Sequence, residues 1–167
     1  MSGGGASSAA RALEGALVVL PAGTPVAALA ERIALRSSAD GLERFGLLAH
    51  SQALQAGLDL ALARADALEA LVLVACAPPT DPGLAQRLAG LKVPTLALFG
   101  TRDPQAPPKT GRAWRALLPS CHVVFVYDAG HDLAADQPLA FADIVSDFVR
   151  DPAAFLINRR DGSVPYA

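Results

Sequence analysis

The chain has 167 residues, which fits one domain and is long enough to bury a hydrophobic core. With 52% hydrophobic and 18% charged residues, its composition suits an α/β protein whose central strands are covered on both faces. The formal net charge of −2, with no basic stripe to neutralise phosphates, argues against a nucleic-acid partner.

The ends of the chain and its two cysteines bear on secretion, membrane insertion and the cellular compartment. Residues 1–10 are rich in glycine and serine and are predicted to be a disordered tail without the charged start of a secretion signal. The apolar run at residues 16–20 stops at a proline and is too short for a membrane span. Cys76 and Cys121 form no CxxC pair, so we expect both to be reduced and buried in a cytoplasmic protein.

The first half of the chain predicts two strands and two helices. An apolar run at residues 16–20 indicates a short buried strand. A helix is predicted at residues 24–37, because a threonine cap and a proline open it. The second strand is predicted at residues 42–49, and a helix with leucines on one face follows at once at residues 51–65.

The second half continues the alternation of strands and helices. The run at residues 71–75 is apolar at every position, which is typical of a strand buried on both sides of a sheet. A short helix ending at Ala89 follows it. The remaining predicted elements are strands at residues 95–99 and 123–127, and helices at residues 109–118 and 138–150.

This alternation predicts an α/β fold with three layers: a mostly parallel sheet of about five strands with helices on both faces. We expect a single domain at residues 11–150 and a C-terminal tail at residues 151–167. In such sheets the chemistry gathers beyond the carboxyl ends of the strands. Ser51, Asp103 and His131 each stand just past such an end.

Ser51 stands at an abrupt corner between a predicted strand and a predicted helix. The residues two before and two after it are Ala49 and Ala53, and small residues are needed there because the two backbones approach closely. The usual pattern at such a nucleophile is Gly-x-Ser-x-Gly, so the alanines make a degenerate version of it. A serine that merely caps a helix start is the alternative interpretation.

A serine hydroxyl becomes a nucleophile at neutral pH when a base removes its proton and an acid orients that base. Ser51, Asp103 and His131 supply these three groups in the chain order Ser, Asp, His. His131 could instead be an ordinary loop histidine, and Asp103 could cap a turn. Asp81 is the reserve acid, although a helix cap before Pro82 explains it better.

Two further segments resemble the α/β-hydrolase superfamily. The stretch L-K-V-P-T-L-A-L-F-G-T-R-D-P-Q-A-P at residues 91–107 is similar to its strand and acid turn. Residues 123–148 are similar to its histidine loop and closing helix, including the Gly-His pair and the later proline. With L-L-A-H-S-Q-A around the serine and the strand at residues 71–75, the likeness covers residues 42–150.

Carried over by position, the resemblance implies nucleophile Ser51, acid Asp103, base His131 and an oxyanion donor in the backbone N–H of Gln52. The second oxyanion donor usually follows a His-Gly dipeptide, which does not occur before the serine. The amides of Ala22 or Gly23 are the candidates that remain. His50 is expected to support the corner by packing beside it.

The chain also departs from the superfamily in length. About fifty residues precede the serine, and residues 77–90 leave no room for a helical lid, so we expect a shortened, lidless core with an open site. Missing early strands would expose a sheet edge, and pairing of two copies across that edge is one way to protect it.

Other polar residues receive structural interpretations. Asp132 and Asp136 are interpreted as solvated loop carboxylates and Trp114 as a core residue of a helix face. His122 has no metal-ligand spacing with the other histidines, and no metal or cofactor is implied.

The leading hypothesis is therefore a serine hydrolase that cleaves a small ester or thioester through an acyl-enzyme. The alternative is a catalytically inactive relative that serves as a binding or assembly subunit, which the alanine corner and the missing His-Gly dipeptide favour. A nucleotide-binding module is a poorer interpretation, because no strand leads into a glycine-rich phosphate loop.

Overall fold

The computed structural model describes residues 17–20 and 44–157. The tail predicted at residues 1–10 and the helix predicted at residues 24–37 lie outside this part of the chain. The strands are β1 (Leu17–Leu20), β2 (Phe45–His50), β3 (Leu68–Val74), β4 (Thr95–Gly100) and β5 (Cys121–Val126). A 3₁₀ turn, η1 (Ser51–Ala53), precedes the helices α3 (Leu54–Ala63), α4 (Pro82–Ala89), α5 (Pro108–Leu117), α6 (Leu133–Asp136), α7 (Pro138–Arg150) and α8 (Pro152–Ile157).

The strands form one five-stranded sheet in the order β1-β2-β3-β4-β5, and every neighbouring pair is parallel. This confirms the predicted parallel sheet of about five strands. The carboxyl ends are in register, because His50 lies opposite Val74 and Gly100 lies opposite Val126. The residues that follow these ends therefore meet along one edge of the sheet.

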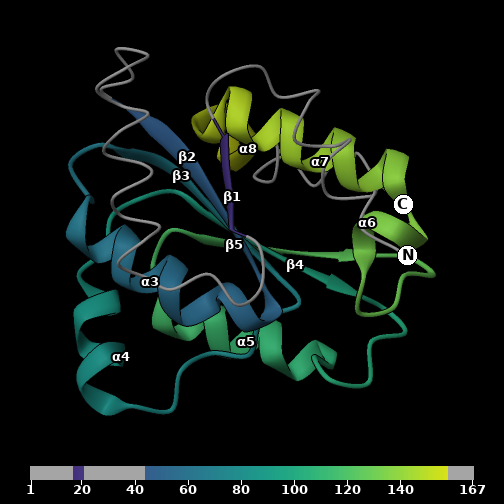
Figure 1. Ribbon diagram of the computed structural model, residues 1–167, viewed down its shortest axis with the longest axis horizontal. Helices are drawn as coiled ribbons and strands as arrows, with labels where there is room; N and C mark the ends of the chain where they lie inside the picture. Colours follow the sequence, from purple (N-terminus) through teal and green to yellow (C-terminus); the bar gives the residue numbers. More distant parts are fainter. Residues whose placement is uncertain (1–16, 21–43, 158–167) are drawn as a thin grey trace.

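Helices cover both faces of the sheet, as predicted (Figure 1). Because the strand order runs in one direction, right-handed crossovers place the connecting helices on one face. The buried side chains Leu58 of α3, Leu88 of α4 and Trp114 of α5 share one core cluster on that face. On the other face α7 adds Phe148 and three further apolar side chains to a second cluster: Phe141, Ile144 and Val145.

Several elements differ from the expectations, and β2 and β5 are shifted by two or three residues at their starts. The strand β3 begins at Leu68 rather than at residue 71, and the charged Glu69 near its start is exposed, which interrupts the apolar pattern there. The helices α6 and α8 were not predicted. The ring of Phe155 in α8 packs edge-on against that of Phe148 at 5.3 Å between centroids, so residues of the predicted tail contact α7.

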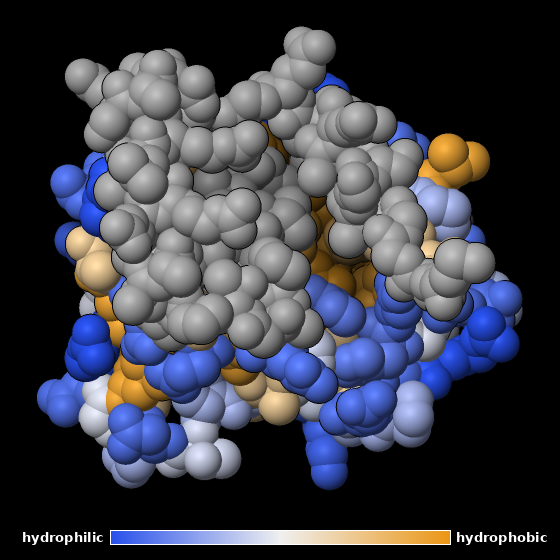
Figure 2. Space-filling model, in the orientation of Figure 1, coloured by the Kyte–Doolittle hydropathy of each residue, from blue (hydrophilic) through white to orange (hydrophobic). Residues whose placement is uncertain are grey.

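The described surface in Figure 2 is mostly hydrophilic, and its apolar residues appear as separate patches. Among the described residues, the most exposed large apolar side chains are Tyr127 and Leu139, at 84% and 80%. Tyr127 begins the loop that carries His131, and Leu139 lies in α7, after that loop and α6.

Candidate active site

Ser51 lies at the corner where β2 ends and η1 begins. Its φ is 44°, in the left-handed region that non-glycine residues rarely adopt and that costs on the order of 1 kcal/mol or more. Ala49 is fully buried and Ala53 is 4% exposed, so larger side chains would clash on both sides of the corner. A strained serine between a strand and a helix is the geometry that presents a hydroxyl above a sheet.

The structure brings Ser51, His131 and Asp103 together from three strand ends. Ser51 Oγ lies 3.0 Å from His131 Nε2, and His131 Nδ1 lies 2.9 Å from Asp103 Oδ2. Along the chain the serine and the histidine are 80 residues apart. Within the described residues these three side chains form one continuous hydrogen-bonded series.

The surroundings of Asp103 determine which ring nitrogen of the neutral His131 imidazole carries the proton. The carboxylate side chain is fully buried, and its Oδ1 accepts the backbone N–H of Gln105 at 2.8 Å. An ionised carboxylate only accepts hydrogen bonds, so His131 Nδ1 must carry a proton and donate it to Oδ2. In the neutral imidazole Nε2 is then free to accept the hydroxyl proton of Ser51.

His50, the last residue of β2, also contacts His131. Its Nε2 lies 3.2 Å from the backbone oxygen of His131, and the two rings are tilted by 48° at 5.4 Å between centroids. His50 therefore contacts both the backbone and the ring of His131. The backbone N–H of Gln52 lies in the first turn after the corner, where helical N–H groups have no intrahelical partner. Ala22 and Gly23 lie outside the described residues.

Cys76 lies directly beneath the corner, which the sequence analysis did not anticipate. Its Sγ is 3.1 Å from the carbonyl oxygen of Val74 and 3.6 Å from that of Ala49, and it also bonds to the backbone of Ser51. Burial raises the pKa of the Cys76 thiol to about 12, and the smaller effect of the backbone hydrogen bonds opposes this rise. The thiol is therefore protonated at neutral pH.

We expect this burial to appear in the pH dependence of stability. The pKa of Cys76 in the folded protein exceeds the ordinary value of 9.0. The contribution of the protonated thiol to the free energy of unfolding is therefore fully present below pH 9 and is lost as the pH rises towards 12. The loss should approach about 1.4 kcal/mol per pH unit in that window. Urea titrations of the wild type and Cys76→Ala between pH 8 and about 10.5 should differ in slope. Parallel curves for the wild type and Cys76→Ala would contradict the assignment.

The loops that carry the acid and the histidine are connected to each other. We call residues 101–107 the Asp103 loop and residues 127–132 the His131 loop. Arg102 donates from its backbone N–H to Ala129 O at 2.9 Å, and its guanidinium donates to Asp128 O at 2.7 Å. An ion pair of 3.0 Å joins Arg102 Nε to Asp128 Oδ1. These contacts hold the two loops in one relative position.

The remaining candidates have structural roles. Asp81 caps α4 by accepting the N–H of Leu84 at 2.8 Å, as expected for a helix cap. Trp114 is fully buried, and its Nε1–H donates to Cys76 O at 2.7 Å. Asp136 is exposed but is not simply solvated, because its Oδ2 accepts the N–H of Gly130 at 2.7 Å. The Asp-Leu-Ala-Ala-Asp pattern of a short capped turn was the available sequence signal for this contact.

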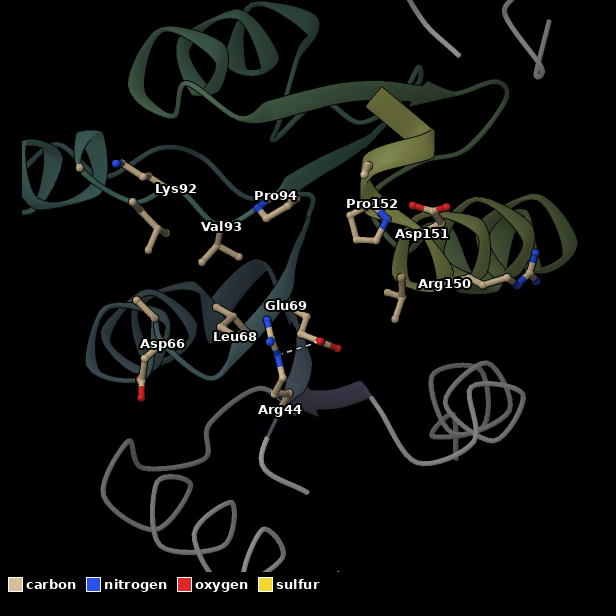
Figure 3. Close-up of a pocket in the computed structure, with 15 residues that line it drawn as sticks. Arg44, Asp66, Leu68, Glu69, Lys92, Val93, Pro94, Arg150, Asp151 and Pro152 are labelled. Carbon is tan, nitrogen blue, oxygen red and sulfur yellow. Dashed lines mark ion pairs between the residues drawn. The ribbon is translucent and has the colours of Figure 1, made fainter. Parts of the chain in front are cut away.

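An open groove of about 730 Å³ lies at the opposite edge of the sheet, near the starts of β3 and β4 (Figure 3). Arg44 and Glu69 face each other there in an ion pair of 2.9 Å, and Lys92 and Asp151 also line the groove. Cations and anions are mixed, so the lining indicates no preference for a ligand of one charge. Ser51, Asp103 and His131 are not among the residues that line it.

The described residues contain neither a cluster of metal-binding side chains nor a helix that could span a membrane. Three or more histidine, cysteine, aspartate or glutamate side chains do not gather at any point of residues 17–20 and 44–157 in a way that could hold a metal ion. In the same part of the chain, every helix is too short or too polar to cross a bilayer.

A parallel sheet with helices on both faces, and a Ser, Asp, His order after the ends of β2, β4 and β5, define an α/β-hydrolase. The profile of the family described as TAP-like protein matches residues 66–166, which is more than half of the chain. The chain belongs to this family of the α/β-hydrolase superfamily. The matched residues include Asp103 and His131, whereas Ser51 lies before them.

Solved structures show the same fold. A predicted CIB-like hydrolase from Thermoplasma acidophilum matches at 21% identity with a TM-score of 0.64, over 76% of this chain and 60% of that protein. A thermophilic esterase from Thermogutta terrifontis matches at 19% identity and a TM-score of 0.64, over 80% of this chain and 75% of the esterase. A carboxylesterase from Bacillus subtilis matches at 16% identity and a TM-score of 0.62, over 80% of this chain and 69% of the carboxylesterase.

The first of these alignments spans less than two thirds of the Thermoplasma protein, so this chain corresponds to part of that structure. A comparison with curated proteins found no match.

Proposed function

We propose that this chain is a serine hydrolase that cleaves an ester or thioester of a small acyl compound through an acyl-enzyme. The observation that carries the proposal is the hydrogen-bonded series from Ser51 Oγ through the His131 imidazole to the buried Asp103 carboxylate. The esterases among the structurally similar proteins are consistent with this chemistry.

In the first half of the reaction, Ser51 Oγ attacks the acyl carbon while His131 Nε2 takes the hydroxyl proton. Asp103 stabilises the imidazolium that results, because its Oδ2 lies 2.9 Å from Nδ1. The imidazolium then donates the proton to the departing alcohol or thiol. In the second half, His131 activates a water molecule that attacks the acyl-enzyme, and the proton returns to Ser51 as the acid is released.

The negative oxygen of the tetrahedral intermediate needs backbone donors. We propose the N–H of Gln52 as one donor, because the first turn after the corner leaves this group without an intrahelical partner. The amide of Ala22 or Gly23 is the proposed second donor. Loss of one such donor typically lowers turnover by about a hundred- to a thousandfold.

The connection between β3 and α4 bears on the substrate. It spans residues 75–81 and carries no inserted helix, so this connection does not cover the strand ends beside Ser51. The short connection on this side leaves room for an acyl substrate beside Ser51. The reaction as proposed uses the protein's own side chains and needs no cofactor.

The proposal is tested with a fluorophosphonate probe, which phosphonylates activated serines. We expect the wild type to be labelled on the peptide that contains Ser51, with no label on Ser51→Ala. Cleavage of p-nitrophenyl acetate by the wild type and not by Ser51→Ala should accompany the labelling. Labelling at another serine, or equal hydrolysis by both proteins, would remove Ser51 from the mechanism.

The second candidate is a hydrolase-like binding or assembly subunit, which the alanines at the corner favour because glycine is usual at both positions. A folded wild type that neither reacts with the probe nor hydrolyses esters would support it. This second candidate includes a dimer in which two copies pair across the sheet edge beyond β1. Light scattering that shows a monomer would exclude this dimer.

A further inference from the structure

We propose that Asp136 is a positioning residue that keeps the His131 loop in place beside Ser51. Asp136 is the last residue of α6, and its Oδ2 accepts the N–H of Gly130 at 2.7 Å. Gly130 directly precedes His131. The carboxylate therefore restrains the peptide next to the proposed base and acts on it through the backbone. A hydrogen bond to a carboxylate is stronger than one between neutral groups.

Three successive residues of the loop each have one backbone polar group held by a different part of the fold. Ala129 O accepts the N–H of Arg102 at 2.9 Å, and His131 O lies 3.2 Å from His50 Nε2. Arg102 belongs to the Asp103 loop and His50 to β2. Asp136 holds the residue between them, from α6.

The position of Asp136 is itself well supported. Leu133, the first residue of α6, is fully buried in the core cluster beneath α7, and Asp132 caps the helix by accepting the N–H of Ala135 at 3.1 Å. The hydrogen bond between Gly130 and Asp136 thus joins the two ends of the segment at residues 130–136, and Leu133 in its middle anchors it to the core. A Cβ on Gly130 would lie 3.0 Å from Asp136 Oδ2, so glycine permits the close approach of the carboxylate.

This inference rests on the proposed role of His131, and the experiment separates the two. Asp136→Ala removes the acceptor, whereas Asp136→Asn removes the charge and keeps an oxygen that can accept the Gly130 N–H. Asp151→Ala is the matched control, because it removes an exposed carboxylate that accepts a backbone N–H, that of Ala154 at 2.9 Å, at the start of another short helix, α8. The three variants are compared in kcat, KM, Tm and the hydrogen exchange of the Gly130 amide.

We expect Asp136→Ala to lower kcat about tenfold, with KM changed by less than about twofold, because the base is displaced while substrate binding is kept. Asp136→Asn should recover most of the loss, and Asp151→Ala should retain wild-type kcat even where its Tm falls equally. The Gly130 amide should exchange at least about tenfold faster in Asp136→Ala only.

Equal losses of kcat in Asp136→Ala and Asp151→Ala would overturn the inference, and so would unchanged exchange at Gly130. Faster exchange with an unchanged kcat would also overturn it, because the contact would then not affect the base. If the wild type neither hydrolyses esters nor reacts with the fluorophosphonate, the proposed function fails. The exchange of Gly130 then decides alone whether Asp136 holds the loop.

Discussion

Replacing Asp103 with asparagine should lower the turnover of p-nitrophenyl esters by about a thousand- to ten-thousandfold while the protein remains folded. The reason lies in the two partners of the carboxylate. Oδ1 accepts the Gln105 N–H at 2.8 Å, so the amide oxygen of an asparagine would be kept at that position. The amide NH₂ would then face His131 Nδ1 and donate to it. The proton of the neutral imidazole would move to Nε2, which could no longer accept the hydroxyl proton of Ser51.

Asp81→Asn is the matched control for this variant. Asp81 caps α4 through Oδ2, and asparagine is an equally good cap. The free energy of unfolding should therefore stay close to that of the wild type, and turnover should remain within about twofold of it. Steady-state kinetics, with circular dichroism to verify folding, would measure both variants. A larger loss in Asp81→Asn than in Asp103→Asn would transfer the role of the acid to Asp81, the reserve candidate from the sequence.

The sheet could be predicted from the sequence because its signals are local. Each strand is an apolar run bounded by turn residues, and β4 is buried at all its positions, as its uninterrupted apolar pattern indicates. The strand ends could be predicted for the same reason. Since parallel strands present their carboxyl ends at one edge, the positions of Ser51, Asp103 and His131 after three different strands predicted that they meet.

The contacts that restrain these side chains could not be predicted in the same way. The bonds from His50 to the His131 backbone and from Cys76 to the corner join segments distant in sequence, so no local pattern records them. The helix α6 has only 4 residues, about one turn, and so shows no helical periodicity. The left-handed φ of Ser51 was not evident either, because glycine is the usual signal for such a conformation.

Gly100 illustrates how a single position can depend entirely on tertiary structure. It ends β4, two strands away from β2, and nothing around it in the sequence indicates a tight contact. A Cβ at this position would lie 2.2 Å from Ala129 O and 2.3 Å from Gly130 O. Both atoms belong to the backbone of the His131 loop, so no side-chain rotation can relieve the overlap.

Gly100→Ala should therefore displace the His131 loop or the end of β4. Overpacking of this kind costs typically about 1–3 kcal/mol of unfolding free energy, and more where only backbone can move. Turnover should fall by about a hundredfold even at temperatures where the variant is folded, because a shift of about 1 Å separates His131 from Ser51. Urea titration and single-turnover kinetics at low temperature would measure the two effects separately.

Gly90→Ala provides the matched comparison for Gly100→Ala. A Cβ on Gly90 would meet its nearest neighbour, Arg87 O, at an ordinary 3.5 Å, and its φ of −83° is accessible to alanine. This variant should be as stable as the wild type or slightly more stable, since alanine restricts the unfolded chain. If Gly100→Ala also retained full stability and turnover, the contact between β4 and the His131 loop would be loose. The geometry of Ser51 and His131 would then depend on Asp103, His50 and Asp136 without help from β4.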